Sequence, residues 1–220
     1  MTLFFNAETI SYLGYTTLFL FIALGFLFLK LVDKAEEGPG IWAFSFLSNA
    51  LGFLFWSLVL PVPTLVNYGL GELLHICGFF LLIIGAYRFM HLPYRWWNLA
   101  LALGIFGLWI VGLWLVKHNA FAASIVLKGV RLLMFTLGGL LLLYRKKGSN
   151  LAGKGRLLAG SCMLAWAAWL FLSAFVKLEA FKELYFGILV GMQVLAAFGM
   201  IVMLVENKQS SLEHSESKLK

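Results

Sequence analysis

The sequence predicts an all-α integral membrane protein, a bundle of seven transmembrane helices with the N-terminus outside and the C-terminus in the cytoplasm. Of its 220 residues, 62% are hydrophobic and 12% are charged, and the mean hydropathy is +0.92. A soluble domain carries about 45–50% apolar and about 25% charged residues, so this chain has too few polar side chains to cover a surface in water. The composition therefore excludes a disordered chain, a collagen, a disulfide scaffold and a typical soluble enzyme.

Seven apolar stretches are each long enough to cross a bilayer, which takes about 20 helical residues. None shows the alternation of apolar and polar residues that is typical of barrel strands, so each is expected to be a helix. The first is too long for a cleavable signal peptide and has Glu8 where a basic segment is expected. The predicted helices are Thr9–Val32, Ile41–Leu60, Val66–Tyr87, Trp96–Val116, Phe121–Tyr144, Leu157–Val176 and Leu184–Glu206.

The basic residues are divided unequally between the two sets of loops. One set holds twelve and the other three, and the richer set is expected to face the cytoplasm. Anionic lipid headgroups at the inner loops are then sufficient partners for the net charge of +7, and no nucleic acid is expected. The twelve are Lys30, Lys34, Arg88, Arg95, Arg145, Lys146, Lys147, Lys154, Arg156, Lys208, Lys218 and Lys220; the three are Lys117, Lys177 and Lys182.

Two of the predicted helices carry charged residues within their apolar sequence. Glu72 and His75 lie in the third, and Lys128 and Arg131 in the fifth, each pair spaced i, i+3 on one helix face. An unpaired charge at the centre of a membrane helix costs about 2.5–3.5 kcal/mol. These side chains are therefore expected to face protein or trapped water, and to have partners.

Helix rise places these four residues about 9–15 Å below the outer membrane edge. Gln193 in the seventh helix lies about 13 Å deep and Asn49 in the second about 16 Å. The common depth predicts one polar cluster in the outer half of the bundle.

Two interpretations of this cluster remain open. In the first, Glu72 forms a buried bridge to Lys128 and Arg131, and the uncharged members only hydrogen-bond between helices. In the second, the cluster lines a pocket that binds a small anionic or amphipathic ligand or a lipid. Two cations facing one carboxylate leave about one positive charge uncompensated, which an anion would relieve. On this account His75 is expected to be neutral at pH 7.

No catalytic, metal or cofactor site is predicted, and we expect the chain not to be an enzyme. The sequence has no H-E-x-x-H, G-x-S-x-G or Gly-rich phosphate motif. His75 is the one histidine in an apolar stretch, whereas a bis-histidine haem site needs two. Cys77 and Cys162 both fall within predicted helices, where they are expected to pack as small apolar residues.

The seventh helix is expected to continue beyond the membrane. After Val205 the chain becomes polar but contains no Gly or Pro, and Val205, Leu212 and Leu219 recur every seven residues, a weak heptad pattern. Residues 1–206 are therefore expected to form the transmembrane domain, and residues 207–220 the start of a helical cytoplasmic linker. The Gly187-x-x-x-Gly191 spacing predicts close helix approach within the bundle or at a dimer seam.

Residues 211–220 (SLEHSESKLK) resemble the linker that leads into a PAS domain in bacterial sensor histidine kinases and diguanylate cyclases. The end of the seventh helix (GMIVMLVE, 199–206) and two stretches of the third, ELLH at 72–75 and YR at 87–88, look like the seven-helix membrane sensor modules of those proteins. The resemblance implies a sensor in the bacterial inner membrane. It further implies a homodimer and a cytoplasmic effector, either downstream in the same chain or a separate protein. The alternative function is a small transporter that uses the same polar cluster.

Overall fold

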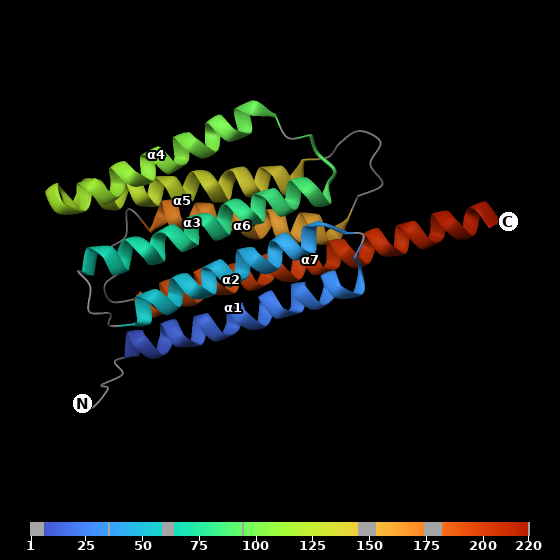
Figure 1. The fold of residues 1–220 in the computed structure, drawn as a ribbon, viewed down its shortest axis with the longest axis horizontal. Helices are drawn as coiled ribbons and strands as arrows, with labels where there is room; N and C mark the ends of the chain where they lie inside the picture. The colour runs from blue at the N-terminus through green and yellow to red at the C-terminus, as the bar shows by residue number, and fades with distance from the viewer. Residues whose placement is uncertain are drawn as a thin grey trace. The chain divides into compact units, whose positions relative to one another are not determined.

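A computed structural model describes residues 7–34, 36–58, 64–93, 95–144, 153–173 and 182–219. The described residues form seven helices, each long and apolar enough to cross a membrane (Figure 1). This confirms the all-helical, multi-pass prediction, while the orientation of the termini stays a prediction. The helices are α1 (Ala7–Val32), α2 (Gly38–Ser57), α3 (Thr64–Phe89), α4 (Trp96–His118), α5 (Ala120–Leu143), α6 (Lys154–Leu172) and α7 (Lys182–Leu219).

The start of α2 differs from the prediction. The helix begins at Gly38 rather than Ile41, because Pro39 occupies its first turn, where the missing N–H costs no helical hydrogen bond. The chain is extended at Leu58, and the predicted end at Leu60 lies outside the described residues.

The sixth helix also starts earlier than predicted. It begins at Lys154 rather than Leu157, after Gly153 in an extended conformation. Its basic first turn was assigned to a loop because charged residues usually mark a span's end. The predicted end at Val176 lies outside the described residues.

The helices form two compact units, Met1–Gly104 and Ile105–Lys220, with the boundary inside α4. In the first unit α2 packs against both α1 and α3, and in the second α6 packs against both α5 and α7. Each unit therefore has a central helix with a neighbour on either side. The division into residues 1–206 and a linker from 207 stays a prediction.

The contact between α1 and α2 is aromatic. Thr16, Phe19, Ala23 and Phe26 are buried at the 3–4 spacing of a single helix face. The ring of Phe19 stacks on Phe46 and Phe53 of α2, with centroid distances of 5.9 and 5.5 Å. This stripe gives α1 one protein-facing side, whereas Phe21 and Phe28, among other large apolar side chains of the helix, are exposed.

Three glycines of α3 receive three large side chains of α2, an arrangement we call the glycine ladder. A Cβ on any of these glycines would overlap the side chain opposite it; for Gly78 the separation from Asn49 Nδ2 would be 2.6 Å. Both sets recur every seven residues, so the antiparallel helices stay in step over four turns. The pairs are Trp42–Gly85, Asn49–Gly78 and Trp56–Gly71.

The second unit brings helix backbones together. A Cβ on Gly155 of α6 would overlap the backbone of α7 near Met203, and one on Gly199 of α7 would lie 2.6 Å from the backbone nitrogen of Ala159. A Cβ on Gly187 or Gly191 would meet none of the described atoms within 4 Å, so the close approach expected at these glycines is not found among the described residues of the second unit. The dimer-seam alternative stays a prediction.

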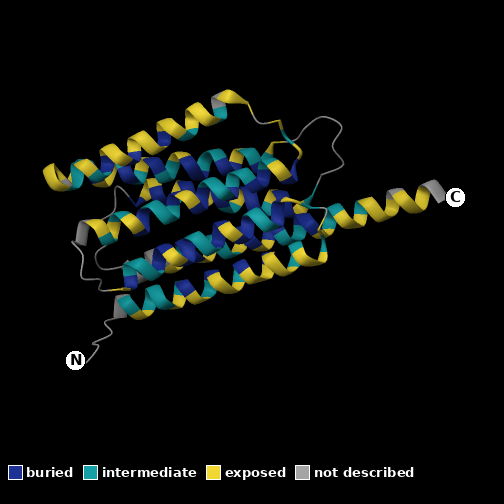
Figure 2. Ribbon diagram, in the orientation of Figure 1, coloured by how far each residue is buried: buried dark blue, intermediate teal, exposed yellow. Residues whose placement is uncertain are grey.

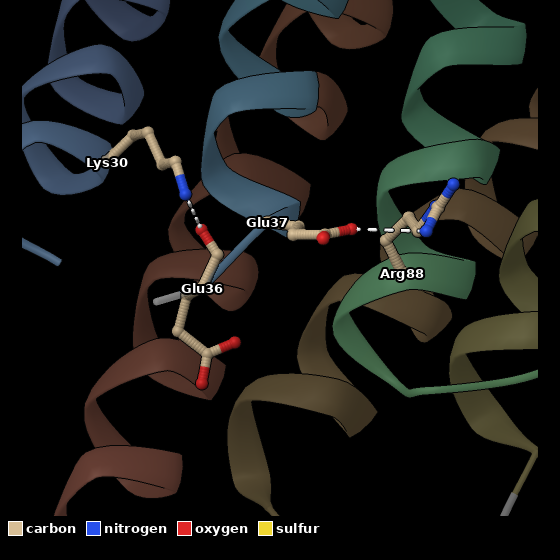
Figure 3. A network of polar contacts seen from close by, with 4 residues as sticks. All are labelled: Lys30, Glu36, Glu37 and Arg88. Carbon is tan, nitrogen blue, oxygen red and sulfur yellow. Dashed lines mark hydrogen bonds and ion pairs between the residues drawn. The ribbon is translucent and has the colours of Figure 1, made fainter. Parts of the chain in front are cut away.

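Polar contacts tie together one end of the first unit (Figure 3). Lys30 Nζ at the end of α1 donates to the carbonyl oxygens of Lys34 and Glu36, at 2.6 and 2.7 Å. Arg88 near the end of α3 forms an ion pair of 3.3 Å with Glu37, with both side chains more than 60% exposed. These contacts fix the turn between α1 and α2, on the side that the charge distribution predicts to be cytoplasmic.

Candidate functional site

The six residues of the predicted cluster divide evenly between the two units. Asn49, Glu72 and His75 belong to the first unit, whereas Lys128, Arg131 and Gln193 belong to the second. Glu72 and Asn49 are buried, with 1% and 7% of their surface exposed, and the other four are half-buried. The side chains within each set can be described directly, and the bridge from Glu72 to the cations stays a prediction.

His75 is the centre of a hydrogen-bonded network in the first unit. Its Nδ1 lies 2.9 Å from Asn49 Oδ1, and Asn49 Nδ2 donates to the carbonyl oxygen of Ser45 at 3.0 Å. Ser45 Oγ in turn donates to the carbonyl oxygen of Gly78 at 2.6 Å, and Ser48 Oγ to that of Leu74 at 2.7 Å. The network joins α2 to α3 through polar groups in the apolar interior.

These contacts fix the tautomer of His75. The Asn49 amide must present its NH₂ group to the Ser45 carbonyl oxygen, since the opposite orientation would put two acceptors together. The Asn49 oxygen therefore faces His75, and an oxygen can only accept. It follows that His75 carries a proton on Nδ1, which in the neutral ring makes Nε2 the acceptor.

Aromatic rings hold the imidazole on two sides. The His75 ring lies 4.5 Å from Phe53 and 4.6 Å from Trp56, measured between centroids, at interplanar angles of 72° and 54°. Trp56 also stacks on Tyr68 at 6.0 Å. Gly52 makes room for the ring, because a Cβ there would lie 2.8 Å from His75 Nε2. The ring is thus positioned by packing as well as by Asn49.

The second unit contributes the basic half of the predicted cluster. Lys128 and Arg131 lie almost one turn apart on α5, consistent with the shared face that their spacing predicts. On α7 the Oε1 atom of Gln193 is buried and accepts no hydrogen bond from any described residue. A buried amide oxygen without a donor destabilises the folded state, so a hydrogen-bond donor is expected near Gln193.

A further polar contact lies where α7 meets the start of α6. The carboxylate of Glu206 accepts hydrogen bonds from the backbone N–H groups of Lys154 at 2.9 Å and Gly155 at 3.3 Å. Sequence reasoning treated Glu206 only as the last residue of the seventh predicted helix, where the chain becomes polar. Gly153 cannot cap a helix with a side chain, and its place just before the basic start of α6 is a signal that could have indicated a missing cap.

The glycine ladder was also missed, although the sequence contains its signal. Trp42, Asn49 and Trp56 recur at seven-residue intervals, as do Gly71, Gly78 and Gly85 in the following helix.

Comparison with protein-family models, with curated proteins and with solved structures finds no match to this chain.

Proposed function

We propose that this chain is the membrane sensor module of a bacterial signal-transduction protein in the inner membrane. A small anionic or amphipathic ligand, or a lipid, binds at Lys128 and Arg131 in the outer half of the bundle. Glu72 holds these cations when the site is empty, and His75, Asn49 and Gln193 orient the ligand. The output is a shift of α7, read by a homodimeric cytoplasmic linker and an effector.

The observation that carries the proposal is the continuity of α7. This helix runs for 38 residues without a break, from an apolar segment into a polar one. None of its described side chains after Leu204 is buried, as Figure 2 shows for the segment toward the C-terminus. A rigid helix that links the bundle to an exposed polar segment carries any displacement at one end to the other.

The polar residues support a ligand rather than a purely structural role. Asn49 and His75 hydrogen-bond to one another within the first unit, and Asn49 and Ser45 link the network to backbone carbonyl oxygens. Register between α2 and α3 is thus already fixed without the half-buried cations of α5. Two basic groups in a span, each costly to bury, are more readily explained by a function than by packing.

The test measures stabilisation by a permanently charged anionic amphiphile. We would reconstitute the chain in phosphatidylcholine nanodiscs and follow its Tm with decanesulfonate, kept below its micelle-forming concentration, with decyl maltoside as the uncharged control. At a hundredfold excess over Kd, a single site raises Tm by about 5–10 °C. The Lys128→Met/Arg131→Met double variant should fold and lose this rise, whereas Lys117→Met, at the exposed end of α4, should keep it.

Two results would count against the proposal. If the double variant only lowers Tm, and decanesulfonate has no effect on the wild type or on Glu72→Gln, the cluster is structural. If the wild-type chain alone carries decanesulfonate across a liposome membrane, the transporter alternative is correct. A sensor should show the stabilisation without such flux.

A further inference from the structure

The contact between Glu206 and α6 has the chemistry of a helix cap supplied from another helix. The first N–H groups of a helix have no partner within it, and the helix dipole makes that end partly positive. The two carboxylate oxygens of Glu206 accept from two of these groups, on Lys154 and Gly155. The contact therefore joins a full negative charge on α7 to the N-terminus of α6.

The local sequence of α6 leaves the capping position open for this carboxylate. Gly153 occupies the N-cap position and contributes no side-chain hydrogen bond. A Cβ at Gly153 would overlap the carboxylate of Glu206. Ser, Thr, Asp or Asn at this position would cap the helix by itself, so glycine makes α6 dependent on α7 for its cap.

The location of Glu206 on α7 gives this contact its importance. On one side, Gly155 and Gly199 bring the two backbones together, so α7 is held tightly against α6. On the other side, the described side chains from Asn207 onward are half-buried or exposed. Glu206 thus marks the place where α7 leaves its partner and becomes an exposed helix.

We propose that Glu206 is a positioning residue, a latch that sets the rotation and height of the exposed segment of α7 relative to α6. The role in signal output rests on the proposed function, because the latch must open or shift when the sensor changes state. The bond to α6 opposes sliding and rotation at the point where they would reach the exposed helix.

The first test is amide exchange at α6, measured on the full chain in nanodiscs by NMR. Glu206→Gln replaces one acceptor oxygen by a donor NH₂ group, so one of the two N–H groups loses its partner. Exchange at Lys154 and Gly155 should then rise about tenfold or more, because hydrogen bonds to charged groups are the stronger class. The control, Glu213→Gln, removes a carboxylate that accepts from Gln209 within the exposed segment, and should leave these amides unchanged.

The second test separates positioning from capping. Spin labels at Leu172 and Leu212, both exposed, would report the distance between the far end of α6 and the exposed segment, on the order of 35 Å from helix rise. Native cysteines are replaced, and labelled chains are diluted with unlabelled ones to exclude distances between chains. Glu206→Gln and Gly153→Ala should each shift or broaden the distribution by about 1–2 Å or more, while Glu213→Gln should not.

The outcomes distinguish this proposal from the ligand site. Faster exchange with an unchanged distance would show that Glu206 only caps α6, and would overturn the latch. No change in either measurement would show that the contact is not maintained, and would also overturn it. Neither test uses a ligand, so the decanesulfonate experiment can fail while the latch holds, and the reverse.

Discussion

The two units join their helices by different means. Between α2 and α3, side chains enter the spaces beside glycines, and Trp42 Nε1 and Ser45 Oγ donate to the carbonyl oxygens of Leu82 and Gly78 at 3.2 and 2.6 Å. Between α6 and its neighbours the backbones approach closely at glycines, and two polar contacts lie at helix ends. Arg156 donates to the carbonyl oxygen of Tyr144 at 3.1 Å, and Glu206 caps α6.

This difference indicates which pair of helices can move against one another at the lower cost in free energy. Directional hydrogen bonds along the α2–α3 interface lose their geometry when either helix slides or turns. Smooth contacts between small residues resist separation but have few directional bonds to break. We therefore expect displacement of α7 against α6 to require less free energy than displacement of α3 against α2.

The largest expected effect is on the backbone contact of the second unit. Gly155→Ala should lower the free energy of unfolding by about 3 kcal/mol, because the atoms that its Cβ would meet belong to the α7 backbone and cannot rotate away. The control is Gly191→Ala in α7, whose Cβ would meet none of the described atoms within 4 Å. Unfolding in mixed micelles measures both, and equal effects would show that the backbone contact is not maintained.

A smaller loss is expected in the glycine ladder. Gly78→Ala should cost about 2 kcal/mol, since the Asn49 amide can move away at the expense of its hydrogen bonds. Gly25→Ala, which meets none of the described atoms within 4 Å, should stabilise α1 by a few tenths to about 1 kcal/mol through helix propensity. A larger loss of unfolding free energy for Gly78→Ala than for Gly155→Ala would contradict this order. It would show that the α2–α3 contact tolerates an added Cβ less well than the α6–α7 contact.

A still smaller loss of stability is expected when one member of the polar network of the first unit is removed. Asn49→Leu keeps the approximate shape but deprives His75 Nδ1 of its acceptor, at a cost of about 1–2 kcal/mol. The wild type should show a protonated Nδ1 in the ¹⁵N spectrum of His75, and the variant a changed tautomer balance. Asn67→Leu, which removes an exposed bond to the Leu58 carbonyl oxygen, is the matched control.

The smallest effect is expected at the surface ion pair between Glu37 and Arg88. A double-mutant cycle with Glu37→Gln and Arg88→Gln should give a coupling of about 0.2–1 kcal/mol, because both side chains are mostly solvated. Raising the salt concentration should reduce it further. A coupling as large as the Asn49 effect would mean that surface charges, and not the ladder, hold this end of the unit together.

The sequence was sufficient to predict the number, type and approximate limits of the helices. Apolar length is a strong signal, because the bilayer requires about 20 residues from every spanning helix. The start of α2 was missed because Pro39 was treated as a breaker, whereas a first turn tolerates proline. Helix ends depend on such local chemistry, which hydropathy does not contain.

The candidate site could be predicted only in part. Glu72 was expected to face protein or trapped water, since a charged group in an apolar helix is costly, and its side chain is buried. The bond from His75 to Asn49 was expected only as general hydrogen bonding, because depth estimates do not give the rotation of a helix. The role of Glu206 depends on a contact with Lys154, 52 residues away in the chain, which no local pattern shows.

The regular spacing of the glycine ladder creates a problem of alignment that the polar network resolves. If α3 moved by seven residues along α2, two of the three large side chains would still meet a glycine, for example Asn49 against Gly71 and Trp42 against Gly78. Steric fit alone would therefore accept more than one pairing of the two helices. Such a movement, about 10 Å, would separate Asn49 from His75. The bond between His75 and Asn49 thus selects the native pairing among alternatives of similar shape.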